Sequence, residues 1–188
     1  MASRENTAYP QFLSTYSQHD LEQFFPFSEE DISWLHSKAR PPSTRLSLAI
    51  LLKCFQHLWH FPPEESIPPE VVSHVRKKLK LSKSISFNYS SGTALSRRRT
   101  VILEYLKVQS FYAGGANSMA RTERLALEAA ELLDQRSDII NAMIEGLIMV
   151  RYELPAFSTL EDLAERAHVA VQTRIFELVS GRIGDAHR

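Results

Sequence analysis

The chain has 188 residues, 44% of them hydrophobic and 23% charged, a balance typical of a folded protein with one core or two small helical lobes. Few segments alternate with period two and only six residues are glycine, so we do not expect a sheet protein. The single Cys54 cannot form an internal disulfide and lies in an apolar run, so we expect its thiol to be buried. The formal net charge is zero, but residues 34–110 carry thirteen Lys and Arg against four Asp and Glu, between two acidic flanks. Such a basic centre indicates a surface that faces a polyanion.

Residues 1–17 show no clear period and are predicted to be an arm that docks through Tyr9, Phe12 and Tyr16. A short helix is expected over 18–25, before Pro26, and a second one after the capping-box sequence SEED at 28–31. The next helix, over 45–60 with Ser43 or Thr44 as its cap, is apolar around most of its circumference. This pattern predicts that it lies in the middle of the fold.

A helix over 69–80 would begin at Pro69, since proline suits the first helical position. Its valines form a core stripe, and its basic residues form a separate cationic face. The Ser-rich segment 81–92 predicts a loop long enough to be functional. A helix from Thr93 or Ser96 to Gln109 follows, and two glycines at 114–115 mark a break.

Three more helices are expected, over 118–133, 137–152 and 159–179. The last would begin at a second capping box, STLE at 158–161, and stop at Gly181. Its core stripe would be Leu160, Leu163, Ala164, Ala167, Val171, Ile175 and Leu178.

The predicted fold class is therefore all-α, a multi-helix bundle of about seven or eight helices with helix-turn-helix-like elements. Its parts would be an N-terminal arm (1–17), a basic helical lobe (18–110), a C-terminal helical lobe packed on the first (116–182) and a tail (183–188). The longest apolar run, 46–55, is too short to span a bilayer, and the N-terminus shows no signal peptide. We therefore expect no membrane partner.

Motifs that would carry chemistry are absent from the sequence. It contains no phosphate-binding GxxxxGK[ST] loop, no GxGxxG and no HExxH, and a single cysteine is too few for a zinc knuckle. His57 and His60 are interpreted as a helix end packing into the core. We assign no catalytic residue, no metal ligand and no cofactor.

Two basic clusters stand out, one with five cations in 76–83 and one formed by Arg97, Arg98 and Arg99. The three arginines lie at or near a predicted helix start, where cations oppose the helix macrodipole. That cost is easier to explain if they face an external anion, because a helix N-terminus with arginines is a good phosphate site. A solvated cationic face without a partner explains the same short runs equally well.

The order of several motifs adds a further indication. The motifs are LEQFF (21–25), FSEED (27–31), RLSLAILL (45–52), FPP (61–63), IPPEVV (67–72), SRR (96–98), ILEYL (102–106) and LPAFSTLEDL (154–163). In this order and spacing the chain resembles the N-terminal domain of Tn3-family transposases over about residues 18–182. It departs from the usual pattern at Arg98, where the family has a His, and at Lys107, where it has a Gly.

The resemblance implies a helical DNA-binding module whose partner is double-stranded DNA, namely the terminal inverted repeats of a transposon. The family's DDE carboxylate triad lies far downstream, so the resemblance implies binding without catalysis, in the bacterial cytoplasm in association with the nucleoid. The DNA-binding residues would be Arg76, Lys77, Lys78, Lys80, Lys83, Tyr89, Ser91, Thr93, Arg97, Arg98 and Arg99.

A second hypothesis stays open beside DNA binding. The aromatic arm and the acidic, amphipathic helix over 159–179 also suit a helical protein–protein interaction or dimerisation domain, so self-association is a further expected partner interaction.

Overall fold

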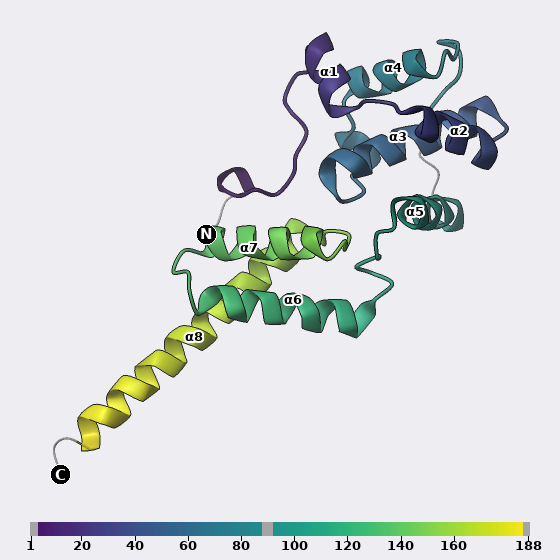
Figure 1. The fold of residues 1–188 in the computed structure, drawn as a ribbon. Helices are drawn as coiled ribbons and strands as arrows, with labels where there is room; N and C mark the ends of the chain where they lie inside the picture. Colours follow the sequence, from purple (N-terminus) through teal and green to yellow (C-terminus); the bar gives the residue numbers. More distant parts are fainter. Residues whose placement is uncertain (1–3, 88–91, 186–188) are drawn as a thin grey trace. The chain divides into compact units, whose positions relative to one another are not determined.

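Helices dominate the computed structural model, which describes residues 4–87 and 92–185 (Figure 1). The α-helices are α1 (Gln18–Phe24), α2 (Glu29–Lys38), α3 (Pro42–Leu58), α4 (Pro69–Lys78), α5 (Thr93–Leu106), α6 (Gly115–Ala130), α7 (Arg136–Met149) and α8 (Phe157–Asp185). The described residues contain no strand, only an isolated bridge between Gln109 and Tyr152. The all-α prediction is confirmed. None of the described helices is both long and apolar enough to cross a membrane.

The chain divides into two compact units. The basic unit is Pro10–Val108, and the C-terminal unit combines Met1–Tyr9 with Gln109–Arg188. The basic unit has thirteen Lys and Arg against nine Asp and Glu, a net charge of +4, and the C-terminal unit has nine against thirteen, a net charge of −4. The zero total therefore conceals two units of opposite charge.

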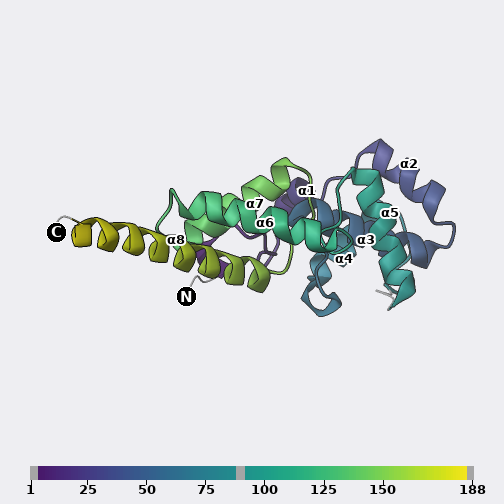
Figure 2. The ribbon, with the colours of Figure 1, turned by 90° about the horizontal axis from the view of Figure 1, so that it is seen from below.

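Helix α3 is the centre of the basic unit. Eleven of its 17 residues are buried, in a continuous run from Leu46 to Phe55 followed by Leu58. Helices α2, α4 and α5 pack against it, and α1 packs against α4. Figures 1 and 2 show α4 and α5 on opposite sides of α3. The predicted central position of this helix is confirmed, and Cys54 is fully buried within it, as expected.

The helix starts in the basic unit follow local sequence signals. The Ser28 hydroxyl accepts a hydrogen bond from the Asp31 amide at 3.0 Å, and the Asp31 carboxylate accepts one from the Ser28 amide at 3.3 Å. This confirms the predicted capping box. Helix α3 instead begins at Pro42, and no side chain caps it, so the prediction of Ser43 or Thr44 as its cap was wrong. The fixed φ of proline suits the first helical position, which moves both residues into the first turn.

Helices α6, α7 and α8 pack against one another in the C-terminal unit. Their core includes Ile139, Ile140, Met143 and Ile144 of α7. Gly146 lets α7 approach α6 closely, because a Cβ atom there would lie 3.0 Å from the Leu125 side chain. The buried Glu153 carboxylate accepts hydrogen bonds from the Ser110 hydroxyl at 2.9 Å and the Phe111 amide at 3.2 Å, which fixes the segment before α6.

The aromatic residues of the predicted arm are packed, as expected, but into different units. The Tyr9 hydroxyl donates to the Pro155 carbonyl at 2.9 Å, and its ring meets the edge of the Phe157 ring at 5.5 Å in the C-terminal unit. Burial raises the pKa of Tyr9 to about 12. In the basic unit Phe12 stacks on a histidine ring, and Tyr16 contacts two phenylalanine rings of the core.

Helix α8 differs from its prediction at both ends. It starts at Phe157, so Ser158 lies inside the helix and is not its cap, and it continues through Gly181 to Asp185. Leu160, Leu163, Ala164 and Ala167 are buried as predicted. The rest of the predicted core stripe is not, since Ile175 is 50% exposed and Leu178 is 58% exposed. The reason is length, because α6 and α7 have 16 and 14 residues and α8 has 29.

Candidate nucleic-acid interface

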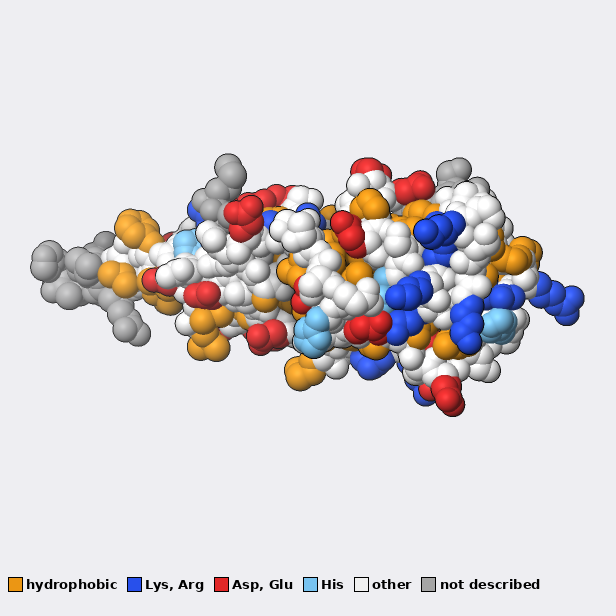
Figure 3. All heavy atoms as spheres, turned by 90° about the horizontal axis from the view of Figure 1, so that it is seen from above, with side chains coloured by type: hydrophobic (Ala, Val, Ile, Leu, Met, Phe, Trp, Pro, Cys, Tyr) orange, Lys and Arg blue, Asp and Glu red, His pale blue; other side chains and the backbone are white. Residues whose placement is uncertain are grey.

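Basic side chains gather on the surface of the basic unit. In Figure 3 the Lys and Arg side chains on the visible face are concentrated on that unit, with few acidic neighbours between them. The Lys and Arg residues of this unit include both predicted clusters and further positions, such as Lys38, that the sequence analysis did not single out. A surface of this kind attracts polyanions.

The first cluster begins in the last turn of α4, with Arg76, Lys77 and Lys78. Cations in the last turn of a helix are stabilised by its macrodipole, so part of this cluster has an explanation within the fold. Lys78 also forms an ion pair with Glu22 of α1. Lys77 is exposed, whereas Arg76 is half-buried. Of these three, Lys77 is the residue most available to a ligand.

Lys80 and Lys83 follow the end of α4. The Leu81 amide donates to the Arg76 carbonyl and the Lys80 amide donates to the Lys77 carbonyl, both at 3.0 Å, which is the Schellman pattern of a helix end. Lys80 occupies the left-handed position of this motif, with φ of 54°, where glycine is the usual residue. Both lysine side chains are exposed. Tyr89 and Ser91 lie outside the described residues.

The second cluster lies deeper in its helix than the sequence suggested. Helix α5 begins at Thr93, so Arg97, Arg98 and Arg99 are its fifth to seventh residues. The macrodipole acts mainly on the first turn, so the expected conflict with the helix start does not arise. The three side chains also diverge around the helix. Arg99 lies over the Phe61 ring, with 5.2 Å from its Cζ atom to the ring centre, whereas Arg97 and Arg98 line a groove.

This groove, which we call the α3–α5 groove, has a volume of about 620 Å³. It is lined by Lys38, Thr44, Leu48, Thr93, Ala94, Arg97, Arg98 and Val101. The structure thus brings together three of the predicted DNA-binding residues, Thr93, Arg97 and Arg98. It adds Lys38 from the end of α2 and Thr44 from the first turn of α3, which the sequence analysis missed. Burial lowers the pKa of the Arg98 guanidinium, which stays charged at neutral pH.

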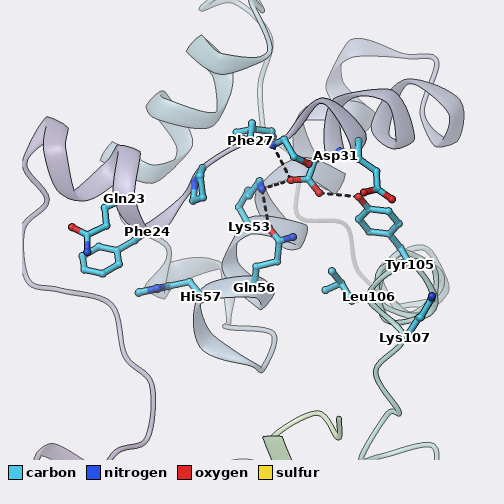
Figure 4. Close-up of a pocket in the computed structure, with 13 residues that line it drawn as sticks. Gln23, Phe24, Phe27, Asp31, Lys53, Gln56, His57, Tyr105, Leu106 and Lys107 are labelled. Carbon is cyan, nitrogen blue, oxygen red and sulfur yellow. Dashed lines mark hydrogen bonds and ion pairs between the residues drawn. The ribbon is translucent and has the colours of Figure 1, made fainter. Parts of the chain in front are cut away.

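A second hollow, of about 910 Å³, opens beside a buried ion pair (Figure 4). The Lys53 ammonium donates to the Asp31 carboxylate at 2.6 Å and to the Gln56 side-chain carbonyl at 2.8 Å. The Tyr105 hydroxyl donates to the other Asp31 oxygen at 2.9 Å. The Lys53 ammonium also lies 4.4 Å from the centre of the Phe27 ring. These contacts join α2, α3 and α5.

The two charges of this network depend on each other. Burial by itself would raise the pKa of Asp31, but the hydrogen bond and positive charge of Lys53 outweigh it, and the pKa is lowered. Burial likewise lowers the pKa of Lys53, against the effect of Asp31. Because each charge is neutralised by the other, we interpret the network as structural. The sequence signal for it was a lysine within the apolar run 46–55.

Two histidines of the basic unit, His57 and His74, pack into its interior. The His57 ring lies among Phe12, Phe24 and Phe25, with ring centres 5.0 to 6.3 Å away. The His74 Nε2 atom donates to the Phe25 carbonyl at 3.2 Å. Burial lowers the pKa of both histidines. Among the residues that the structure describes, no group of three His, Cys, Asp or Glu side chains could hold a metal ion.

Comparison with known proteins adds two findings. The chain is 24% identical over 163 residues to the transposase for transposon Tn1546 of Enterococcus faecium. That match covers 85% of this chain but 16% of the relative, so the chain corresponds to a small part of that transposase. A family model described as a domain of unknown function, DUF4158, matches residues 1–167. On the extent of that match, the chain belongs to the DUF4158 family.

Proposed function

We propose that this chain is the DNA-binding module of a Tn3-like transposase, and that it recognises the terminal inverted repeats of its transposon without catalytic activity of its own. The observation that carries the proposal is the basic unit, with its net charge of +4 and its α3–α5 groove, in a chain similar to a transposase. Such a module works on transposon DNA in the bacterial cytoplasm, in association with the nucleoid.

Phosphate contacts would supply most of the affinity, and they are independent of sequence. If the basic unit neutralises about six phosphates, the logarithm of the binding constant falls against the logarithm of salt concentration with a slope of about −5. Recognition of the inverted repeat requires contacts to base edges in addition, for which arginine is the best suited of the exposed cations.

The test is a fluorescence-anisotropy titration at several salt concentrations. One labelled duplex carries the terminal inverted repeat of the transposon that encodes the chain, and the other carries the same bases in scrambled order. We expect a steep salt dependence with both duplexes and tighter binding to the repeat. Binding that does not depend on salt, or no binding to either duplex, would refute the proposal.

A second candidate function is self-association, and the exposed end of α8 favours it. Val169, Ile175, Phe176, Leu178 and Val179 are each at least 50% exposed on this helix. Five exposed apolar side chains within eleven residues of one helix favour an interaction site. Light scattering of the purified chain should then report a dimer, and replacing Ile175 and Leu178 by serine should return it to a monomer. A monomer over the whole concentration range would refute this function.

A further inference from the structure

The α3–α5 groove gathers positive charge that the fold itself accounts for only in part. Its cations are Lys38, Arg97 and Arg98, and none of the described residues that line it is acidic. Within the described part of the chain, no carboxylate lies within 4.0 Å of the charged groups of Lys38 or Arg97. The hollow beside Lys53 is different, because Glu30 and Asp31 line it and Lys53 is already paired.

The groove also borders the positive ends of two helices. Thr44 lies in the first turn of α3, and Thr93 is the first residue of α5. The amide groups of a first turn have no intrahelical partners, and they carry the positive end of the macrodipole. The two threonine hydroxyls add hydrogen-bond donors at the same place. Three cations, two hydroxyls and two helix starts therefore surround one groove.

We infer that the α3–α5 groove is where the basic unit holds the sugar–phosphate backbone of duplex DNA, an inference that rests on the proposed function. Lys38 and Arg97 contact successive phosphates from the two sides of the groove. Thr44 and Thr93 donate hydrogen bonds to phosphate oxygens, as hydroxyl groups commonly do in DNA complexes. The apolar floor, which includes Leu48 and Val101, suits the carbon atoms of deoxyribose.

The two basic clusters differ in how far the fold itself accounts for their charge. In the first cluster, the dipole of α4 and the ion pair with Glu22 account for much of the charge at Lys78. In the groove, Lys38 lies in the last turn of α2 and is stabilised by that helix dipole in the same way, but among the described residues Arg97 has neither a helix end nor an ion pair to account for its charge. We therefore assign the larger share of backbone contact to the groove, and a smaller share to the exposed lysines that follow α4.

The test compares two charge-matched double variants. Lys38→Gln with Arg97→Gln removes two exposed cations from the groove, and Lys77→Gln with Arg124→Gln removes two exposed cations elsewhere. The probe is a labelled duplex of mixed sequence, titrated by anisotropy over a series of salt concentrations. Because both sites of each variant are exposed, circular dichroism and thermal unfolding should show folds equal to that of the wild type.

We expect the groove variant to bind about 100-fold more weakly, at about tenfold per removed phosphate contact. The slope of affinity against salt should become shallower by about 1.8, since each lost phosphate contact contributes about 0.9. The affinity of the matched variant for the duplex should fall by no more than the contribution of the Lys77 contact. Adding Arg98→Gln to the groove variant should weaken the affinity further and make the salt dependence shallower still.

The outcomes distinguish this inference from the proposed function. If the wild type binds the duplex and the groove variant keeps its affinity and slope, the groove does not hold DNA and the inference fails alone. The same result is expected if the groove takes an acidic protein segment. If the wild type binds no duplex at low salt, the inference and the proposed function both fail.

Discussion

The buried pair of Lys53 and Asp31 leads to the sharpest prediction about stability. Replacing Lys53 by methionine keeps the length and most of the volume of the side chain but leaves the Asp31 carboxylate without its counter-ion. The exposed fractions of the two side chains are 2% and 8%, so water cannot easily take the place of the ammonium. Breaking a buried ion pair by removing one partner costs about 3 to 5 kcal/mol.

We expect a loss near the lower end of that range, about 3 kcal/mol of unfolding free energy at pH 7. Asp31 would keep its hydrogen bonds from the Ser28 amide at 3.3 Å and from the Tyr105 hydroxyl at 2.9 Å. These two donors would satisfy part of the carboxylate but would not neutralise it. Removal of the ammonium also takes away the contact with Gln56 at 2.8 Å.

The assay is urea unfolding followed by circular dichroism, with Lys83→Met as the control. Lys83 is exposed, so its replacement should change the unfolding free energy by no more than about 0.5 kcal/mol.

Acidification gives a second readout of the same pair. In the wild type the pKa of Asp31 is lowered, so its contribution to stability is present above the ordinary value of 3.8 and is lost as pH falls through the folded-state value. In the variant burial raises that pKa, so protonation relieves the strain and the difference between the two proteins narrows as pH falls. A loss below about 1 kcal/mol at pH 7, or a difference that widens on acidification, would refute the reasoning.

Three further predictions concern the basic unit. Ser28→Ala removes the side-chain cap of α2 and should cost about 1 kcal/mol in urea unfolding, and no loss would contradict the capping role. Burial lowers the pKa of His57 below 6.5, so thermal stability should fall as pH drops below about 6.5, where the unfolded chain binds protons that the folded chain does not. His57→Phe should weaken this pH dependence, and an unchanged profile would exclude His57 as a source. Lys80→Gly relieves a left-handed backbone position and should leave the melting temperature equal or higher, so a clear decrease would indicate that the lysine side chain itself stabilises the fold.

Local patterns in the sequence determined much of the secondary structure. The apolar circumference of α3 placed it at the centre, and the serine and aspartate of 28–31 fixed the start of α2, because both signals act within one or two turns. At α8 the apolar pattern predicted burial correctly only for the first part of the helix. A stripe of apolar residues shows which face would be buried, but not whether a neighbouring helix is long enough to cover Ile175 and Leu178.

The tertiary structure alone decided which charges belong to the core and which are available to a ligand. Lys53 pairs with Asp31 across 22 positions, and Asp31 meets Tyr105 across 74, separations at which no spacing rule applies. Three consecutive arginines looked like one site in the sequence, yet the turn of α5 sends Arg99 onto Phe61 and leaves Arg97 and Arg98 in a groove with Lys38. The sequence by itself determined the helices and the concentration of positive charge. The packing of α2, α3 and α5 decided where that charge converges, because a groove is formed by residues that are distant in the chain.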